Sequence, residues 1–238
     1  KPTVAVFLGA PEDIFTGHRT AAAHSLEEAA LKCAALLGAP TQDFGFSKEQ
    51  LDDISARERA KYAPGQRYLR GLYCGGTFAE EGLLNYRRLC PGRTFYSNLS
   101  IHSAQKLADK ERSVGDCVLD LGAEDFTAEA PHPEFEPELR LRRLRRELLD
   151  EEVAVITLDF ITGPGVHPDP AGAFCEEIRL ARKKRKSHVT VIANICGSPL
   201  DPQDTAKIAR RLEEAGVIVA ASNLQTDRQE AQIQNGQA

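Results

Sequence analysis

Short apolar runs and helical segments alternate through residues 153–221, and this alternation restricts the fold more than any other feature of the sequence. Three runs are apolar without an every-second-residue pattern: 153–160, 188–195 and 217–221. Helices are predicted between them at 169–186 and 201–216, because each begins with an Asp-Pro pair that suits an N-cap and a first helical residue. Apolar strands joined by helices through short loops form a parallel sheet covered on both faces. The sequence therefore predicts an α/β fold.

Earlier segments follow the same pattern. Strands are predicted at 3–9, just before Gly75 and at 116–122, and helices at 25–38, 47–62, 77–89 and 139–149. Residues 10–24 are predicted to form a loop, and residues 93–107 an irregular segment with one short helix. The polar residues 225–238 are predicted to form a short helix that frays into disorder.

A glycine turn at Gly75-Gly76-Thr77 is the strongest single candidate for a binding site. It joins an apolar run to a segment of good helix formers within residues 69–82. A helix that begins there directs its unpaired N–H groups and its positive dipole end toward one point, which suits a phosphate or carboxylate. Glycine pairs also form ordinary turns between strand and helix, so both interpretations stay open.

Other candidate residues follow the ends of the predicted strands. In a parallel sheet these ends share one edge, where open α/β folds place their ligands. The candidates for anion binding, besides the turn at Gly75, Gly76 and Thr77, are Gly163, Gly165, Gly197 and Ser198. Candidates for substrate binding are Asp120, Asp125 and Asn223. Each of these positions also fits a plain turn or local capping role.

Two histidines lie next to prolines, which hold a loop in place. His132 is flanked by Pro131 and Pro133, and His167 precedes Pro168. A rigid loop can present an imidazole for acid–base chemistry. His167 is therefore a candidate catalytic residue, with a structural turn as the alternative.

Composition and charge narrow the classes of function. The net charge of −5 argues against general nucleic-acid binding. The basic stretches 140–146 and 179–186 lie in predicted helices and are interpreted as solvated faces. No apolar run approaches the ~20 residues of a membrane span. The six cysteines have no CxxC or zinc-ligand spacing, so we expect reduced thiols in a cytoplasmic protein and predict no metal site.

The chain begins with Lys1 and enters an apolar strand almost at once. A domain seldom starts inside its first core strand. We therefore expect a fragment or a processed part of a longer polypeptide.

An ordered series of segments along nearly the whole chain resembles the FdrA family, which is related to succinyl-CoA synthetases. The segments are KPTVAVFLGA, RGLYCGGTFAEE, DLGAEDFT, PHPEFEPELRLRRL, HPDPAGA and AGVIVAASN. The resemblance implies flavodoxin-like parallel sheets of the synthetase ligase-domain type. It implies four parts: a partial α-subunit-like CoA-ligase domain at 1–46, a connector at 47–66, a β-subunit-like CoA-ligase domain at 67–225 and a polar tail at 226–238. The resemblance further implies that the family's N-terminal CoA-binding-like domain is missing here.

The resemblance also implies roles for two places in the chain. In succinyl-CoA synthetases a loop histidine carries phosphate, which the N-termini of two helices stabilise. The helix at Gly75-Gly76-Thr77 matches one of these helices, and His18 after Gly17 matches the histidine. Arg19-Thr20 replaces the small residues that follow it, and FdrA proteins generally do not keep this histidine. His18 is thus a candidate phosphohistidine, with a surface loop residue as the alternative.

Three functions follow from the resemblance. The first is a subunit of an oxamate carbamoyltransferase in allantoin (purine) degradation, acting on an acyl- or carbamoyl-phosphate-type species. The second is an ADP-forming acyl-CoA synthetase that uses a phosphohistidine, and the third is a non-catalytic binding or scaffolding subunit. CoA or an acyl or carbamoyl phosphate is the implied ligand, with most of the CoA site on the missing domain. The implied partners are a small anionic substrate and other subunits or a second copy.

Overall fold

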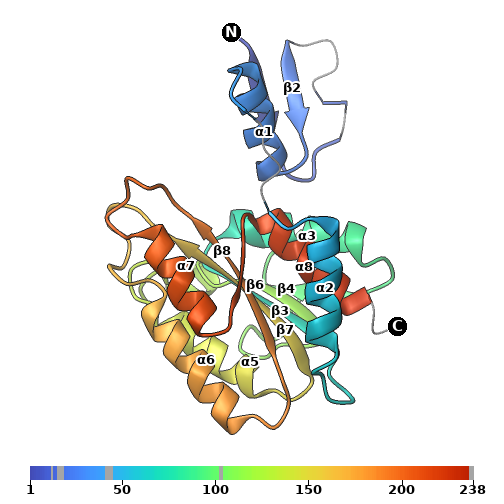
Figure 1. Ribbon diagram of the computed structural model, residues 1–238, viewed down its shortest axis with the longest axis vertical. Coiled ribbons are helices and arrows are strands. Elements are labelled where there is room, and N and C mark those ends of the chain that lie inside the picture. The colour runs from blue at the N-terminus through green and yellow to red at the C-terminus, as the bar shows by residue number, and fades with distance from the viewer. Residues whose placement is uncertain (12, 15–18, 41–44, 102–103, 236–238) are drawn as a thin grey trace. The chain divides into compact units, whose positions relative to one another are not determined.

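The computed structural model describes residues 1–238 except 12, 15–18, 41–44, 102–103 and 236–238 (Figure 1). It contains two compact units, Lys1–Gly45 and Phe46–Ala238. In the first unit, strands β1 (Thr3–Val6) and β2 (Thr20–Ala23) pair in parallel, and helix α1 (Leu26–Leu36) follows them. Strand β2 lies within the predicted loop 10–24, so that expectation is wrong for its four residues.

The second unit is built on a parallel sheet with the order β5-β4-β6-β3-β7-β8-β9. Its described strands are β3 (Tyr68–Tyr73), β4 (Phe95–Ser97), β5 (Gln105–Lys106), β6 (Asp116–Asp120), β7 (Val153–Ile161), β8 (Thr190–Cys196) and β9 (Ile218–Ala220). Every neighbouring pair is parallel. The predicted α/β fold is thus confirmed. Strands β4 and β5 fall in the segment predicted to be irregular, because strands this short leave no periodic pattern in a sequence.

Helices cover both faces of this sheet (Figure 1). Helices α2 (Lys48–Arg59), α3 (Gly76–Leu89) and α8 (Asn223–Asn235) lie on one face. Helices α5 (Glu138–Leu149), α6 (Gly172–Lys184) and α7 (Thr205–Glu214) lie on the other, and the short α4 (Glu124–Thr127) follows β6. None of the described helices is both long and apolar enough to cross a membrane.

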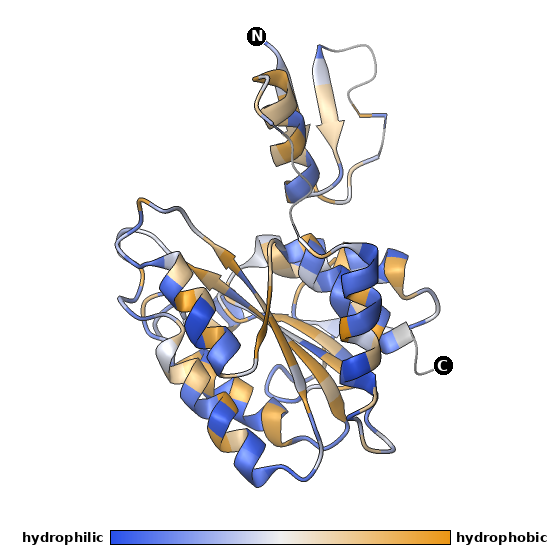
Figure 2. Cartoon of the chain, in the orientation of Figure 1, coloured by the Kyte–Doolittle hydropathy of each residue, from blue (hydrophilic) through white to orange (hydrophobic). Residues whose placement is uncertain are grey.

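The apolar core lies along the central strands, as the orange colour in Figure 2 shows. Successive β3 residues point to opposite faces. Leu69 and Tyr73 therefore join the cluster under α3, whereas Leu72 joins the larger cluster under α5 and α6. Strand β7 is buried along almost its whole length, as a central parallel strand covered on both faces must be.

Two polar segments are packed more closely than their sequences indicate. Residues 47–66, the implied connector, include α2, which belongs to the second unit and contacts α8 through a hydrogen bond from Gln229 Nε2 to Ser55 Oγ (2.8 Å). The short helix predicted within residues 225–238 is present as part of α8, but it is packed against the second unit through residue 235. The reason is that α8 buries polar side chains against polar partners, which a hydrophobic pattern cannot reveal.

Candidate functional site

The carboxyl end of β3 lies where the connections of the sheet change sides. The chain leaves β3 into α3 on one face, whereas the helices after its neighbours β6 and β7 lie on the other face. Such a switch point opens a crevice at the carboxyl edge of an open α/β sheet. The predicted turn Gly75-Gly76-Thr77 stands at this place, and it forms the start of the candidate site.

Helix α3 begins in that turn. Gly75 is the N-cap, with an extended backbone, and Gly76 is the first helical residue. Within the described residues no side chain caps this end, and Thr77 is exposed. The first-turn N–H groups of a helix have no intrahelical partner. The end of α3 therefore presents uncapped donors and a positive dipole end to a small anion.

Asp120 lies beside this helix end, at the last position of β6. Its Oδ1 accepts a hydrogen bond from Gly122 N (2.9 Å), and its Oδ2 would be 3.1 Å from a Cβ added at Gly76. Burial raises the pKa of the Asp120 carboxyl, although the Gly122 N–H and the nearby His132 act in the opposite direction. The Asp120 carboxyl therefore takes up a proton more readily than an ordinary aspartate does.

His132 closes the site from the loop after α4. Its Nε2 lies so close to Gly122 that a Cβ there would meet the ring as well as the carbonyl oxygen of Cys74. The loop between Pro131 and Pro133 thus holds an imidazole over the carboxyl ends of β3 and β6. The proline pattern was the sequence signal for this rigidity, but only the fold brings His132 next to the Cys74 turn.

The crowding around Gly122 leads to a prediction about two glycines. Alanine at Gly122 would overlap the Cys74 carbonyl, whereas alanine at Gly75 meets nothing within 4 Å. We expect Gly122→Ala to lower the free energy of unfolding by about 1–3 kcal/mol, as overpacking does. Gly75→Ala should cost only several tenths of a kcal/mol, because glycine caps a helix slightly better than alanine. Urea unfolding of both variants checks this, and equal losses would contradict the tight approach at Gly122.

A buried ion pair fixes the residue just before the turn. Asp159, in β7, is fully buried and accepts hydrogen bonds from the N–H and the thiol of Cys74 (3.0 Å each). The Arg140 guanidinium binds the same carboxylate and also donates to the carbonyl oxygen of Leu72 (2.7 and 2.9 Å). Burial, followed by the Asp159 charge, raises the pKa of Cys74 well above its usual range. Cys74 is therefore a protonated structural thiol.

The sequence did not point to Asp159 or Arg140. Asp159 lies inside an apolar strand, where a single carboxylate is the only visible signal. Arg140 was assigned to a solvated basic face, and this is wrong for Arg140 and for Arg143, both of which are buried. Their burial depends on acceptors that come from distant parts of the chain.

His167 lines a small pocket next to this ion pair. The other lining residues are Cys74, Pro133, Glu134, Pro137, Arg140, Phe160, Ile161, Val166, Pro170 and Phe174. The His167 N–H donates to the Glu134 carbonyl oxygen (2.9 Å), and its Nδ1 accepts from Asp169 N (3.1 Å). His167 is thus held in the wall of a pocket that includes Cys74, the residue before the α3 turn.

The other predicted anion-binding turns are closed by side chains of the chain itself. Gln203 accepts a hydrogen bond from Gly163 N (2.9 Å) and donates to carbonyl oxygens of the same loop. Asp201 accepts from Ser198 N (2.7 Å) and from the Thr162 hydroxyl. These contacts also explain why α7 begins later than predicted, with Asp204 as its N-cap. Gly197 has no room for a side chain, and Gly165 has a positive φ of 89°.

The remaining predicted residues lie elsewhere. Asp125 is exposed in α4. Asn223 begins α8 and donates to the carbonyl oxygen of Phe78 (3.2 Å) and to Glu81 Oε2 (2.9 Å), both in α3. His18 lies outside the described residues. Across the described part of the chain, no group of three or more His, Cys, Asp or Glu side chains could hold a metal ion.

Comparison with known proteins identifies the family. The CoA-ligase family model matches residues 72–233, from the end of β3 into α8. The chain belongs to the CoA-ligase family. It is also 34% identical, over 229 residues, to the uncharacterized protein YahF of Escherichia coli (strain K12). That match covers 95% of this chain but only 44% of YahF. Membership indicates an association with CoA at the family level.

The described residues of this CoA-ligase domain suit a small anion better than the whole of CoA. The α3 end supplies uncapped backbone donors, and the neighbouring pocket is small and is lined by apolar residues together with Glu134, Arg140 and His167. Arg140 in that pocket is already neutralised by Asp159. No residue here is therefore assigned to the nucleotide part of CoA.

Proposed function

We propose that this chain is the ligase-domain part of an FdrA-type group-transfer enzyme that handles an acyl- or carbamoyl-phosphate-type species. The favoured activity is that of an oxamate carbamoyltransferase subunit in the degradation of allantoin. One observation carries the proposal: the uncapped N-terminus of α3 stands at the switch point of the sheet, inside the region matched to the CoA-ligases. Both acyl and carbamoyl transfer through phosphate need such an anion site.

The mechanism assigned to these residues is electrostatic. The Gly76 and Thr77 N–H groups and the α3 dipole hold the oxyanion and stabilise the negative charge that develops during transfer. In the carbamoyltransferase, the bond between the carbamoyl carbon and the oxalurate nitrogen breaks, a bond to a phosphate oxygen forms, and the nitrogen takes up a proton as oxamate leaves. Other subunits, or a second copy, complete the site.

A charge change at Thr77 tests the anion site directly. Thr77→Asp places a carboxylate at the N-terminus of α3. This carboxylate interacts favourably with the helix dipole but repels a bound anion. We expect this variant to bind inorganic phosphate at least about tenfold more weakly than the wild type, with Tm unchanged or raised. Thr77→Asn, which has the same shape without the charge, is the matched control and should retain binding. Calorimetric titration measures both, and equal phosphate affinity in the two variants would refute the site.

Turnover assays separate the candidate functions. With the full-length protein and its partner subunits, carbamoyl transfer predicts oxamate and carbamoyl phosphate from oxalurate and phosphate. The alternative ADP-forming acyl-CoA synthetase predicts acid-labile label from ATP or an acyl phosphate that His18→Ala abolishes. Tight subunit association without either reaction would support the scaffolding alternative and exclude the other two.

A further inference from the structure

Helix α8 buries acidic side chains against α3. Asp227 and Glu230 are fully buried on α8, and Glu81 is buried on the facing side of α3. The apolar contribution of α8 is small: Leu224, Ala231 and Ile233 are its buried apolar residues in the part of the chain described. The attachment of this helix therefore depends on its polar contacts.

The hydrogen bonds to Asp227 and Glu230 come from uncharged donors. Asp227 accepts from the hydroxyl of Tyr73 (3.4 Å) and from Asn85 Nδ2 (2.7 Å). Glu230 Oε2 accepts from the hydroxyl of Tyr86, and Glu230 Oε1 is buried without a hydrogen-bond partner in the described structure. Among the described residues, neither carboxyl group forms an ion pair with a lysine, arginine or histidine.

The charged groups around Asp227 and Glu230 do not offset the cost of burying these two carboxyl groups. Glu81 on α3 and Asp116 on β6 add negative charge, and Tyr73 and Tyr86 are neutral. Of the cations nearby, Arg93 is bound to Asp116 by two 2.7 Å hydrogen bonds, and Arg88 donates to Asn85 Oδ1 (3.4 Å). On the α2 side, Tyr62 faces Glu230 and Arg59 donates to the Gln232 carbonyl oxygen. From β7, Thr157 offers a hydroxyl.

An ionised carboxylate is costly in such surroundings because nothing replaces its hydration. Burial raises the pKa of Asp227 to about 7. Burial also raises the pKa of Glu230 well above its usual range, and the charge of Asp227 adds to this effect. The two groups titrate as a coupled pair. In the folded protein, at least one of them is a neutral acid in mildly acidic solution.

We propose that the docking of α8 is proton-coupled: the helix stays packed on α3 while Asp227 and Glu230 are protonated and loosens as they ionise. The inference goes beyond the proposed function and does not depend on it. The sign follows from linkage, because a folded-state pKa above the unfolded value makes the folded form bind the extra proton. The stabilisation is complete below pH ~4 and is lost as the pH rises through the folded-state values. Each carboxyl favours the opening of α8 by up to about tenfold per pH unit in that range.

Hydrogen exchange of the full chain tests this between pH 5.5 and 8.5, after correction for the intrinsic exchange rate. We expect the protection of α8 amides in the wild type to fall at least about tenfold across the range. In the Asp227→Asn/Glu230→Gln double variant, which keeps the side-chain shapes without the charges, protection should change less than about twofold. Glu213→Gln, at an exposed carboxyl of α7, is the matched control and should behave as the wild type does.

A second measurement uses only the wild-type protein, so it does not depend on whether a variant folds. Carboxyl ¹³C resonances of the wild-type protein report the titration of Asp227 and Glu230 directly. Midpoints near the ordinary values of about 4 would overturn the proposal. Constant α8 protection in the wild type, or an equal fall in the double variant, would overturn it as well.

Discussion

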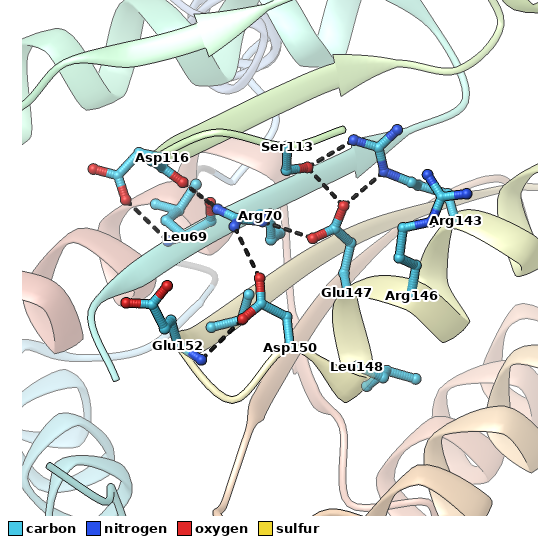
Figure 3. A network of polar contacts seen from close by, with 12 residues as sticks. Leu69, Arg70, Ser113, Asp116, Arg143, Arg146, Glu147, Leu148, Asp150 and Glu152 are labelled. Atoms are coloured by element: carbon cyan, nitrogen blue, oxygen red, sulfur yellow. Dashed lines mark hydrogen bonds and ion pairs between the residues drawn. The ribbon is translucent and has the colours of Figure 1, made fainter. Parts of the chain in front are cut away.

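Glu147→Gln is expected to lower the free energy of unfolding by about 3–5 kcal/mol, because it leaves buried arginines without their counter-charge. Glu147, on α5, accepts from Arg70 Nε (2.7 Å) with one oxygen and from Arg143 Nε (2.6 Å) with the other. Ser113 donates to the same carboxylate (2.6 Å). Figure 3 shows these groups converging from β3, α5 and the loop before β6. After the substitution, Arg70 still donates to the carbonyl oxygens of Leu69 and Gly115, but among the described residues its remaining carboxylate partner is the more distant Asp150 (3.5 Å).

The same helix supplies a control for this prediction. The side chain of Glu147 is 3% exposed, whereas that of Glu138 is 68% exposed in its pair with Arg145 (2.7 Å). Glu138→Gln should therefore cost no more than about 1 kcal/mol, as exposed ion pairs do. Chemical denaturation of both variants at pH 7 gives the comparison. Similar losses for Glu138→Gln and Glu147→Gln would contradict the decisive role of burial.

The network should also contribute to the loss of stability in acid. Burial by itself would raise the pKa of Glu147, but the charges of Arg70 and Arg143 outweigh this effect and lower it. A lowered folded-state pKa contributes stability above the unfolded value of about 4.3 and loses it as the pH falls through the folded-state value. Glu147→Gln should accordingly show a smaller decrease in stability below pH ~4 than the wild type.

The second large effect is expected at the candidate site. Asp159→Asn keeps the shape of the side chain but leaves the buried Arg140 uncompensated, and we expect a loss of about 3–5 kcal/mol in the free energy of unfolding. Because Asp159 also holds the N–H of Cys74 (3.0 Å), the substitution loosens the turn that begins α3. Phosphate affinity should fall under conditions in which the variant is still folded.

An exposed pair in the same unit is the control for Asp159. Asp169 and Arg211 also form a 2.7 Å ion pair, but their side chains are 47% and 37% exposed. Asp169→Asn should change the free energy of unfolding by no more than about 1 kcal/mol and leave phosphate affinity unchanged. Urea unfolding and calorimetric titration measure both quantities. A stable Asp159→Asn protein with unaltered phosphate binding would show that the ion pair does not position the α3 turn.

Local sequence patterns were sufficient to predict features that depend only on neighbouring residues. The run of apolar residues that becomes β7, the glycines that precede α3 and the proline-flanked His132 could all be recognised without coordinates, since each depends on neighbouring residues. Short elements could not be predicted in this way. Strands β4 and β5 contain three and two residues, and pairing with neighbours in the sheet, not a sequence period, makes them strands.

By itself the sequence determined the α/β class and the place of the glycine turn, because strand and helix patterns and turn glycines act over a few residues. The tertiary structure alone decided which polar groups are buried and what they contact. It placed Asp159 against Arg140, Asp201 against the Ser198 turn and Asp227 against Asn85 of α3. Such groups are stable in the interior only with partners that are distant in sequence, so no local pattern distinguishes them from solvated surface residues.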